Sequence, residues 1–265
     1  METFAEYILN EKDLAAKMEI VYYLAKKEKI YFDKTVIIKT ELARLFLKYN
    51  KVELDENLIM TACLLCNCKK VQNAKSLDEI HSYAKNGAEY LETLGFDKRF
   101  CKICEEVNRY SGSAPRERES DILELVEQFG GMLLDRPERI GFEPDEAMVL
   151  LIHRNLKDQY NRYVEIFSQF IEMLEEINMG EFVEIKALKK LVKIYNETDD
   201  LIDFIKKVIN NYEPQIDSFI DKRYKKIKDE MFKENFQNMR PLFTEETTKK
   251  ILKSIEEREQ AILNN

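Results

Sequence analysis

The sequence predicts an all-α protein. Apolar residues recur every three or four positions along almost the whole chain, and no stretch alternates apolar and polar residues over the length of a strand. Only seven glycines and five prolines interrupt the 265 residues, of which 45% are hydrophobic and 35% are charged. This composition is typical of a globular, helix-rich protein rather than a disordered one. A chain of this length buries a sizeable core in one or two domains.

The expected helices follow one another along the chain. Residues 13–28 and 36–49 each carry one apolar face and are expected to form amphipathic helices. Residues 55–67, DENLIMTACLLCN, are apolar nearly all round, which predicts the central helix of a bundle. A helix over 84–96 is expected to end at Gly95, because glycine readily takes the left-handed conformation that follows many helices. Further helices are expected over 97–109, 119–133 and 143–153.

The amino-acid composition changes after residue 175. From there on Lys, Glu, Ile and Phe dominate, with Gly180 as the one glycine. Amphipathic segments such as 199–211 and 245–257 continue the helical pattern. The sequence therefore predicts a helical domain over residues 1–174 and an appended C-terminal helical region over residues 175–265.

Charge and cysteine content restrict the partners and the compartment. The net charge is −8, and residues 101–150 hold twelve Asp and Glu against six Lys and Arg, so this segment would repel a polyanion unless metal ions screened it. The longest apolar run, LIMTACLLC, is half of what a membrane span needs. Five cysteines without a visible export signal predict a reducing, cytoplasmic location. Frequent Lys, Ile, Asn and Glu indicate an AT-rich bacterial genome.

Several segments resemble one protein family. TACLLCNCKK (61–70) is similar to the His-Asp helix of HD-domain metal-dependent phosphohydrolases, which usually reads A-A-L-L-H-D-I-G-K. HSYAKNGAEYLETLGF and ICEEVNRYSGSAP resemble the next helices and the Gly-Tyr-Pro loop of the HD-GYP branch. DRPERIGFEPDEAM (135–148) is the most specific piece, and 158–170 resembles the family's last helix. The resemblance covers about residues 20–174 and implies an HD-type helical bundle.

The resemblance also implies a metal site that this chain does not supply. The family uses a cluster of His and Asp to hold two or three divalent metals, which activate water against a phosphodiester. The positions of those ligands carry Cys66, Asn67, His81, Glu106, Val107 and Glu127. A carboxamide cannot bridge two metals as a carboxylate does, valine cannot coordinate, and the whole chain holds two histidines. We therefore expect a non-catalytic protein with a plugged or altered pocket, whose core residues keep the frame of the fold.

The cysteines allow a second interpretation. They form C-x-x-C-x-C and C-x-x-C clusters on two segments that are both expected to be helical, and thiolates suit zinc or iron-sulfur sites. Because structural zinc pairs usually lie on turns and cysteine is a common core residue, buried and reduced cysteines are favoured over a metal site. The residues concerned are Cys63, Cys66, Cys68, Cys101 and Cys104.

Three basic or imidazole features have structural alternatives. His81 is expected to be a surface or capping residue at the start of a helix. Lys70 matches a lysine that can contact phosphate in the family, but Lys69 and Lys70 are explained equally well as cations at a helix end. The segment KRYKKIK (222–228) has acidic neighbours and is expected to be a solvated helix face rather than a nucleic-acid track.

Two functions from different classes remain open. The first is a catalytically inactive HD-GYP-like protein that acts in signalling or regulation by binding a protein partner, or itself, through the C-terminal helices, with Tyr212, Phe232 or Phe236 as aromatic anchors. The alternative is an active phosphohydrolase or cyclic di-GMP phosphodiesterase that uses His81, Glu106, Glu127 and the cysteines. Binding of a cyclic dinucleotide without hydrolysis is a weaker third hypothesis, because the acidic 101–150 segment opposes it. No cofactor, nucleic acid or membrane partner is expected.

Overall fold

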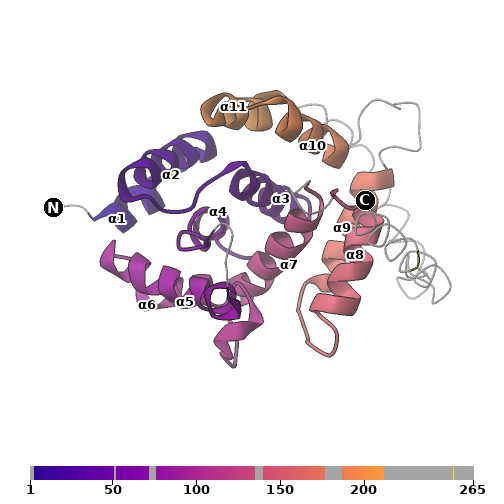
Figure 1. Cartoon of the computed structure of the whole chain (residues 1–265), viewed down its shortest axis with the longest axis horizontal. Coiled ribbons are helices and arrows are strands. Elements are labelled where there is room, and N and C mark those ends of the chain that lie inside the picture. Colours follow the sequence, from indigo (N-terminus) through magenta and orange to yellow (C-terminus); the bar gives the residue numbers. More distant parts are fainter. Residues whose placement is uncertain are drawn as a thin grey trace.

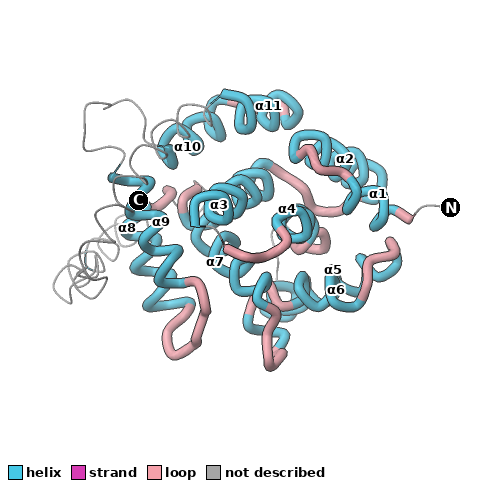
Figure 2. Tube along the Cα trace, turned by 180° about the vertical axis from the view of Figure 1, so that it is seen from behind, coloured by secondary structure: helices cyan, strands magenta, loops and turns pink. Residues whose placement is uncertain are grey.

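The structure is a computed structural model that describes residues 3–50, 52–71, 76–134, 140–176 and 187–211, together with Lys253. Within these ranges the chain forms eleven α-helices, one 3-10 turn and one π-helical turn, and it contains no strand (Figure 2). The predicted all-α class is confirmed.

Two helices occupy the middle of the bundle, and the others surround them (Figure 1). The central pair is α3 (Lys34–Asn50) and α4 (Glu56–Leu65). On one side lie α1 (Phe4–Asn10) and α2 (Leu14–Glu28), and on the other lie α5 (Leu77–Thr93) and α6 (Lys98–Glu105). The remaining helices are α7 (Arg118–Met132), α8 (Pro144–Leu150), α9 (Val164–Glu176), α10 (Ala187–Glu197) and α11 (Leu201–Asn211).

The central helices bury nearly their whole surface because their apolar residues are not confined to one face. Ala62, Leu64 and Leu65 of α4 are buried, as the sequence predicts. In α3, for which the sequence predicts a single apolar face, the buried set instead spans all sides of the helix, from Val36 to Tyr49. Burial of each large apolar side chain contributes roughly 1.5 to 3 kcal/mol, so these two helices anchor the bundle.

Several helix boundaries differ from the prediction. The central helix ends at Leu65, two residues early, so Asn67 and Lys70 lie in the turn that follows it. Helix α5 begins at Leu77, where the Ser76 side chain accepts a hydrogen bond from the amide of Glu79. His81, predicted to start this helix, therefore lies in its second turn.

Two further helices are shorter than the sequence predicts. The helix expected over 97–109 stops at Glu105, and a separate 3-10 turn, η1, covers Arg109–Ser111. The helix expected from residue 158 starts only at Val164, because Asn161 turns back and its Nδ2 donates to the carbonyl oxygen of Asp121. In both cases, side-chain contacts with α7 or with the segment that leads into it hold the chain in a loop.

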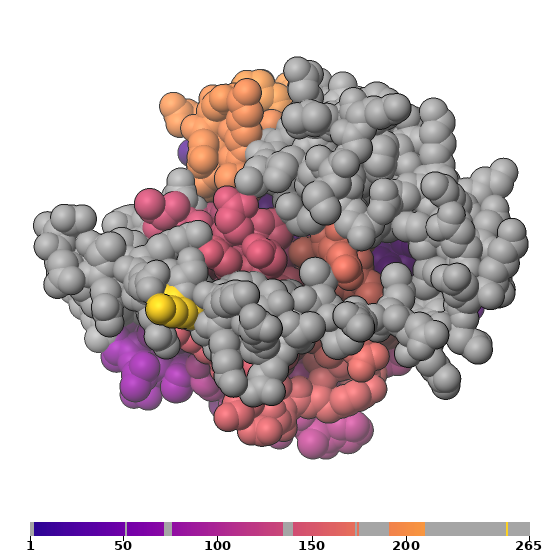
Figure 3. Space-filling view, turned by 90° about the vertical axis from the view of Figure 1, so that its right-hand side faces the viewer, coloured from indigo at the N-terminus to yellow at the C-terminus, as the bar shows by residue number. Residues whose placement is uncertain are grey.

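The first part of the appended region packs on the bundle. Helix α11 contacts α2 and α3, and its residues Phe204, Ile205 and Val208 are buried. The Lys34 ammonium donates to the carbonyl oxygens of Tyr195 (2.7 Å) and Thr198 (2.9 Å), which closes the turn between α10 and α11 against α3. Figure 3 shows these two helices, in orange, at the upper edge of the molecule.

Part of the appended region lies outside the described residues. This applies to segments 222–228 and 245–252, and to the expected anchors Tyr212, Phe232 and Phe236. Among the helices within the described ranges, none combines the length and the hydropathy of a membrane span.

Candidate functional site

A group of four polar side chains meets inside the bundle, and we call it the Lys39–Glu127 centre. The Lys39 ammonium of α3 donates to Oε1 of Glu127 on α7 at 2.6 Å. The other carboxylate oxygen, Oε2, accepts from Nδ2 of Asn67 at 2.9 Å. Lys70 completes the group with its ammonium 3.5 Å from Oε1. Two of the predicted site positions, Asn67 and Glu127, are therefore brought together.

Helix packing holds the centre in place. Helices α3 and α7 lie against each other along much of their length, and the side chain of Lys39 crosses between them. Its stem fits over Gly130 of α7 so closely that a Cβ atom there would lie 2.8 Å from Lys39 Cγ. Asn67 and Lys70 reach the carboxylate because α4 ends at Leu65 and the chain turns over α7. The early end of the central helix thus creates the site.

The electrostatics of the centre favour a charged pair. Burial alone would raise the pKa of Glu127, but the ammonium groups of Lys39 and Lys70 and the hydrogen bond from Asn67 lower it to about 2. Burial lowers the pKa of Lys39, and the Glu127 carboxylate opposes that effect. The side chains of this pair are only 4% and 10% exposed. The pair is therefore almost entirely removed from water.

Aromatic side chains fill the space on the Lys70 side. The Lys70 ammonium lies 5.7 Å from the ring centroid of Tyr31 and 5.9 Å from that of Tyr83, within reach of a cation–π interaction. Burial raises the pKa of Tyr83, and the nearby charge of Glu127 and the Cys66 thiol raise it further. The Tyr83 ring is thus next to the centre and helps to close it.

The centre does not fit a pair of divalent metals. Both oxygens of Glu127 already accept hydrogen bonds from nitrogen donors, and Lys39 provides a fixed positive charge beside them. Val107 is buried in the apolar core. The amide oxygen of Asn67 is buried without a hydrogen-bond partner, but one neutral oxygen is no metal site. Within the described ranges, no three His, Cys, Asp or Glu side chains converge in a metal-binding arrangement.

Two further predicted ligand positions, Glu106 and His81, make their contacts outside the centre. Oε2 of Glu106 accepts from the amide of Glu117 and the hydroxyl of Ser120, both at 2.8 Å, so this carboxylate fastens the start of α7. His81 is exposed and stacks on Tyr110 of η1 with ring centroids 3.8 Å apart. Its position at the surface agrees with the structural interpretation of this residue.

All five cysteines are buried and free, as the favoured interpretation predicts. Burial raises the pKa of each thiol, to about 12 for Cys68 and about 11 for Cys101, and well above the usual value for Cys66 and Cys104. Burial thus favours the neutral thiol over the thiolate form that binds metals. Only the expectation that all five lie within helices is wrong, because α4 ends before Cys66.

Sequence reasoning missed Lys39, although a signal for it exists. Lys39 follows Val36 by three residues and precedes Ala43 by four, so it occupies an apolar stripe of α3. A charged residue at such a position must find a buried partner.

It also missed a second ionic network, in which Asp121 and Glu124 of α7 bind the guanidinium groups of Arg109, Arg116 and Arg162. This network joins α7 to η1 and to the start of α9. The bonds of Arg109 and Arg162 link separate segments to α7, whereas Arg116 bonds the first turn of the helix that it precedes.

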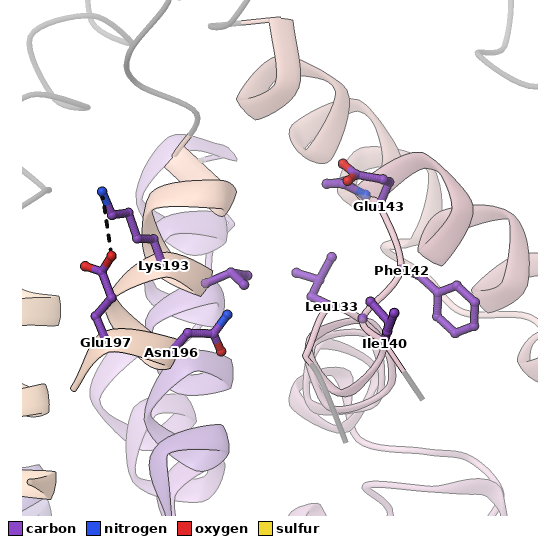
Figure 4. A pocket seen from close by; sticks show the side chains of 10 residues that line it. Leu133, Ile140, Phe142, Glu143, Lys193, Asn196 and Glu197 are labelled. Atoms are coloured by element: carbon purple, nitrogen blue, oxygen red, sulfur yellow. Dashed lines mark ion pairs between the residues drawn. The ribbon is translucent and has the colours of Figure 1, made fainter. Parts of the chain in front are cut away.

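A cleft of about 460 Å³ lies elsewhere, between α10 and the segment that joins α7 to α8 (Figure 4). Its apolar lining includes Leu133, Phe142 and Val192, and Lys193 and Glu197 form an ion pair of 3.7 Å on α10. None of the predicted site residues lines it.

Comparison with protein families, with curated proteins and with solved structures finds no match to this chain.

Proposed function

We propose that this chain is a catalytically inactive, HD-GYP-like protein that acts in signalling or regulation by binding another protein. The observation that carries the proposal is the buried contact of Lys39 with Glu127. Glu127 stands at a position where the family resemblance implies a metal ligand, and an ammonium group now neutralises its charge.

The charge balance explains why such a site can persist without metals. A buried carboxylate without a counter-ion costs several kcal/mol, so loss of the metals has to be compensated or the carboxylate removed. Lys39 supplies one positive charge in a fixed position, and Asn67 replaces a second negative charge by a neutral amide. A lysine ammonium has no vacant coordination position and cannot lower the pKa of a water molecule as a divalent metal does.

The alternative of an active phosphohydrolase has less support. It requires His81, Glu106 and Glu127 to build one metal set together with the cysteines, yet each of them has a different local role. His81 stacks on Tyr110, Glu106 fastens the start of α7, and Glu127 binds Lys39. The cysteine thiols, which would have to complete the set, are buried, and burial raises their pKa.

Metal content and turnover test the proposal. We expect elemental analysis of the purified chain to find no stoichiometric divalent metal. Added Mn²⁺ should leave the melting temperature unchanged, and the chain should not hydrolyse cyclic di-GMP in its presence. Two bound metals per chain would contradict the proposal. Hydrolysis of cyclic di-GMP that is lost in His81→Ala and retained in the control His153→Ala would also contradict the proposal.

A further inference from the structure

We draw no further inference here: the strongest candidate, the cleft between α10 and the segment that joins α7 to α8, has an apolar lining with the exposed ion pair of Lys193 and Glu197 at its side, and nothing in the described structure shows what occupies it.

Discussion

Lys39 and Lys17 lie at positions where the helical period places apolar side chains, and each is buried. Lys39 finds a carboxylate, whereas Lys17 finds neutral oxygens, because its ammonium donates to the carbonyl of Ile8 at 2.7 Å and to Thr61 Oγ1 at 2.6 Å. The two lysines therefore place charge in the core in different ways, and their substitution should have different consequences.

Breaking the Lys39–Glu127 pair should destabilise the protein strongly. Lys39→Met leaves a buried carboxylate without its main counter-ion, for which we expect a loss of about 3 to 5 kcal/mol in the free energy of unfolding. The double variant Lys39→Met/Glu127→Gln removes both charges and should recover most of that loss. Urea denaturation measures both. Lys193→Ala is the control, because its ion pair with Glu197 is exposed and should change stability by less than about 0.5 kcal/mol. A double variant as unstable as Lys39→Met would contradict this account.

The same pair makes stability depend on acid pH. The pKa of Glu127 is lowered to about 2 in the folded protein, below its ordinary value of roughly 4.3. The unfolded chain therefore binds the proton more readily, and the contribution of the pair is complete above about pH 4.5 and is lost as the pH falls toward 2. Glu127→Gln should be less stable than the wild type at pH 7, and the difference should shrink across this interval. A constant difference from pH 7 to 2.5 would show that Glu127 is not the titrating group.

Lys17 should make the stability of the protein depend on pH in the alkaline range. Burial, with a smaller effect of Lys12, lowers its pKa to about 8. Between pH 8 and about 10.5 the unfolded chain holds more protons than the folded one, so stability from this group rises with pH. Relative to Lys17→Met, the wild type should gain on the order of 1 kcal/mol between pH 8 and 10. Thermal unfolding of both proteins at the two pH values measures the gain, and parallel curves would refute it.

At the scale of helices, the residues at which α4, α5 and α9 begin or end determine where the site residues lie. The sequence predicts the end of α5 at Gly95, and the structure confirms it with a φ of +94°. The premature end of α4 and the late start of α9 coincide with contacts to α7, made by Asn67 and Asn161, which local sequence does not contain. A helix end marked by glycine is a local property, whereas one set by tertiary contacts is not.

Gly95 and Gly112 form a matched pair of substitutions. Both have a left-handed φ, but a Cβ atom on Gly95 would lie 2.8 Å from Cβ of Thr3, while nothing lies within 4 Å of one on Gly112. Gly112→Ala should cost only the backbone strain, about 1 kcal/mol. Gly95→Ala should cost more, because the start of α1 must also move. Melting temperatures give the comparison, and equal losses would mean that Thr3 is not restrained.

At the scale of the whole molecule, the described part of the appended region belongs to the bundle. Helices α10 and α11 share the core through Phe204, Ile205 and Val208. A chain cut after residue 174 loses this cover from α2 and α3. The binding role that the sequence assigns to residues 175–265 is therefore better tested by a cut after Asn211.

Two truncations should behave differently. Residues 1–211 keep the described core, including α10 and α11, and should melt at a clearly higher temperature than residues 1–174. Residues 1–174 should lose several kcal/mol, since three large apolar side chains each contribute roughly 1.5 to 3 kcal/mol on burial. Differential scanning calorimetry separates the two. A chain of residues 1–174 as stable as the full protein would show that α11 is dispensable for the bundle.

Sequence alone determined the helical class, most helix positions, the end of α5 and the buried, free cysteines, because these depend on the spacing and chemistry of neighbouring residues. It also identified Asn67 and Glu127 as positions of interest. Only the tertiary structure decided that Lys39 is their partner, since 88 residues separate it from Glu127. It likewise placed His81 and Glu106 away from that centre. Which charges share a low-dielectric interior depends on how helices pack, and helix periodicity fixes only the face on which a residue lies.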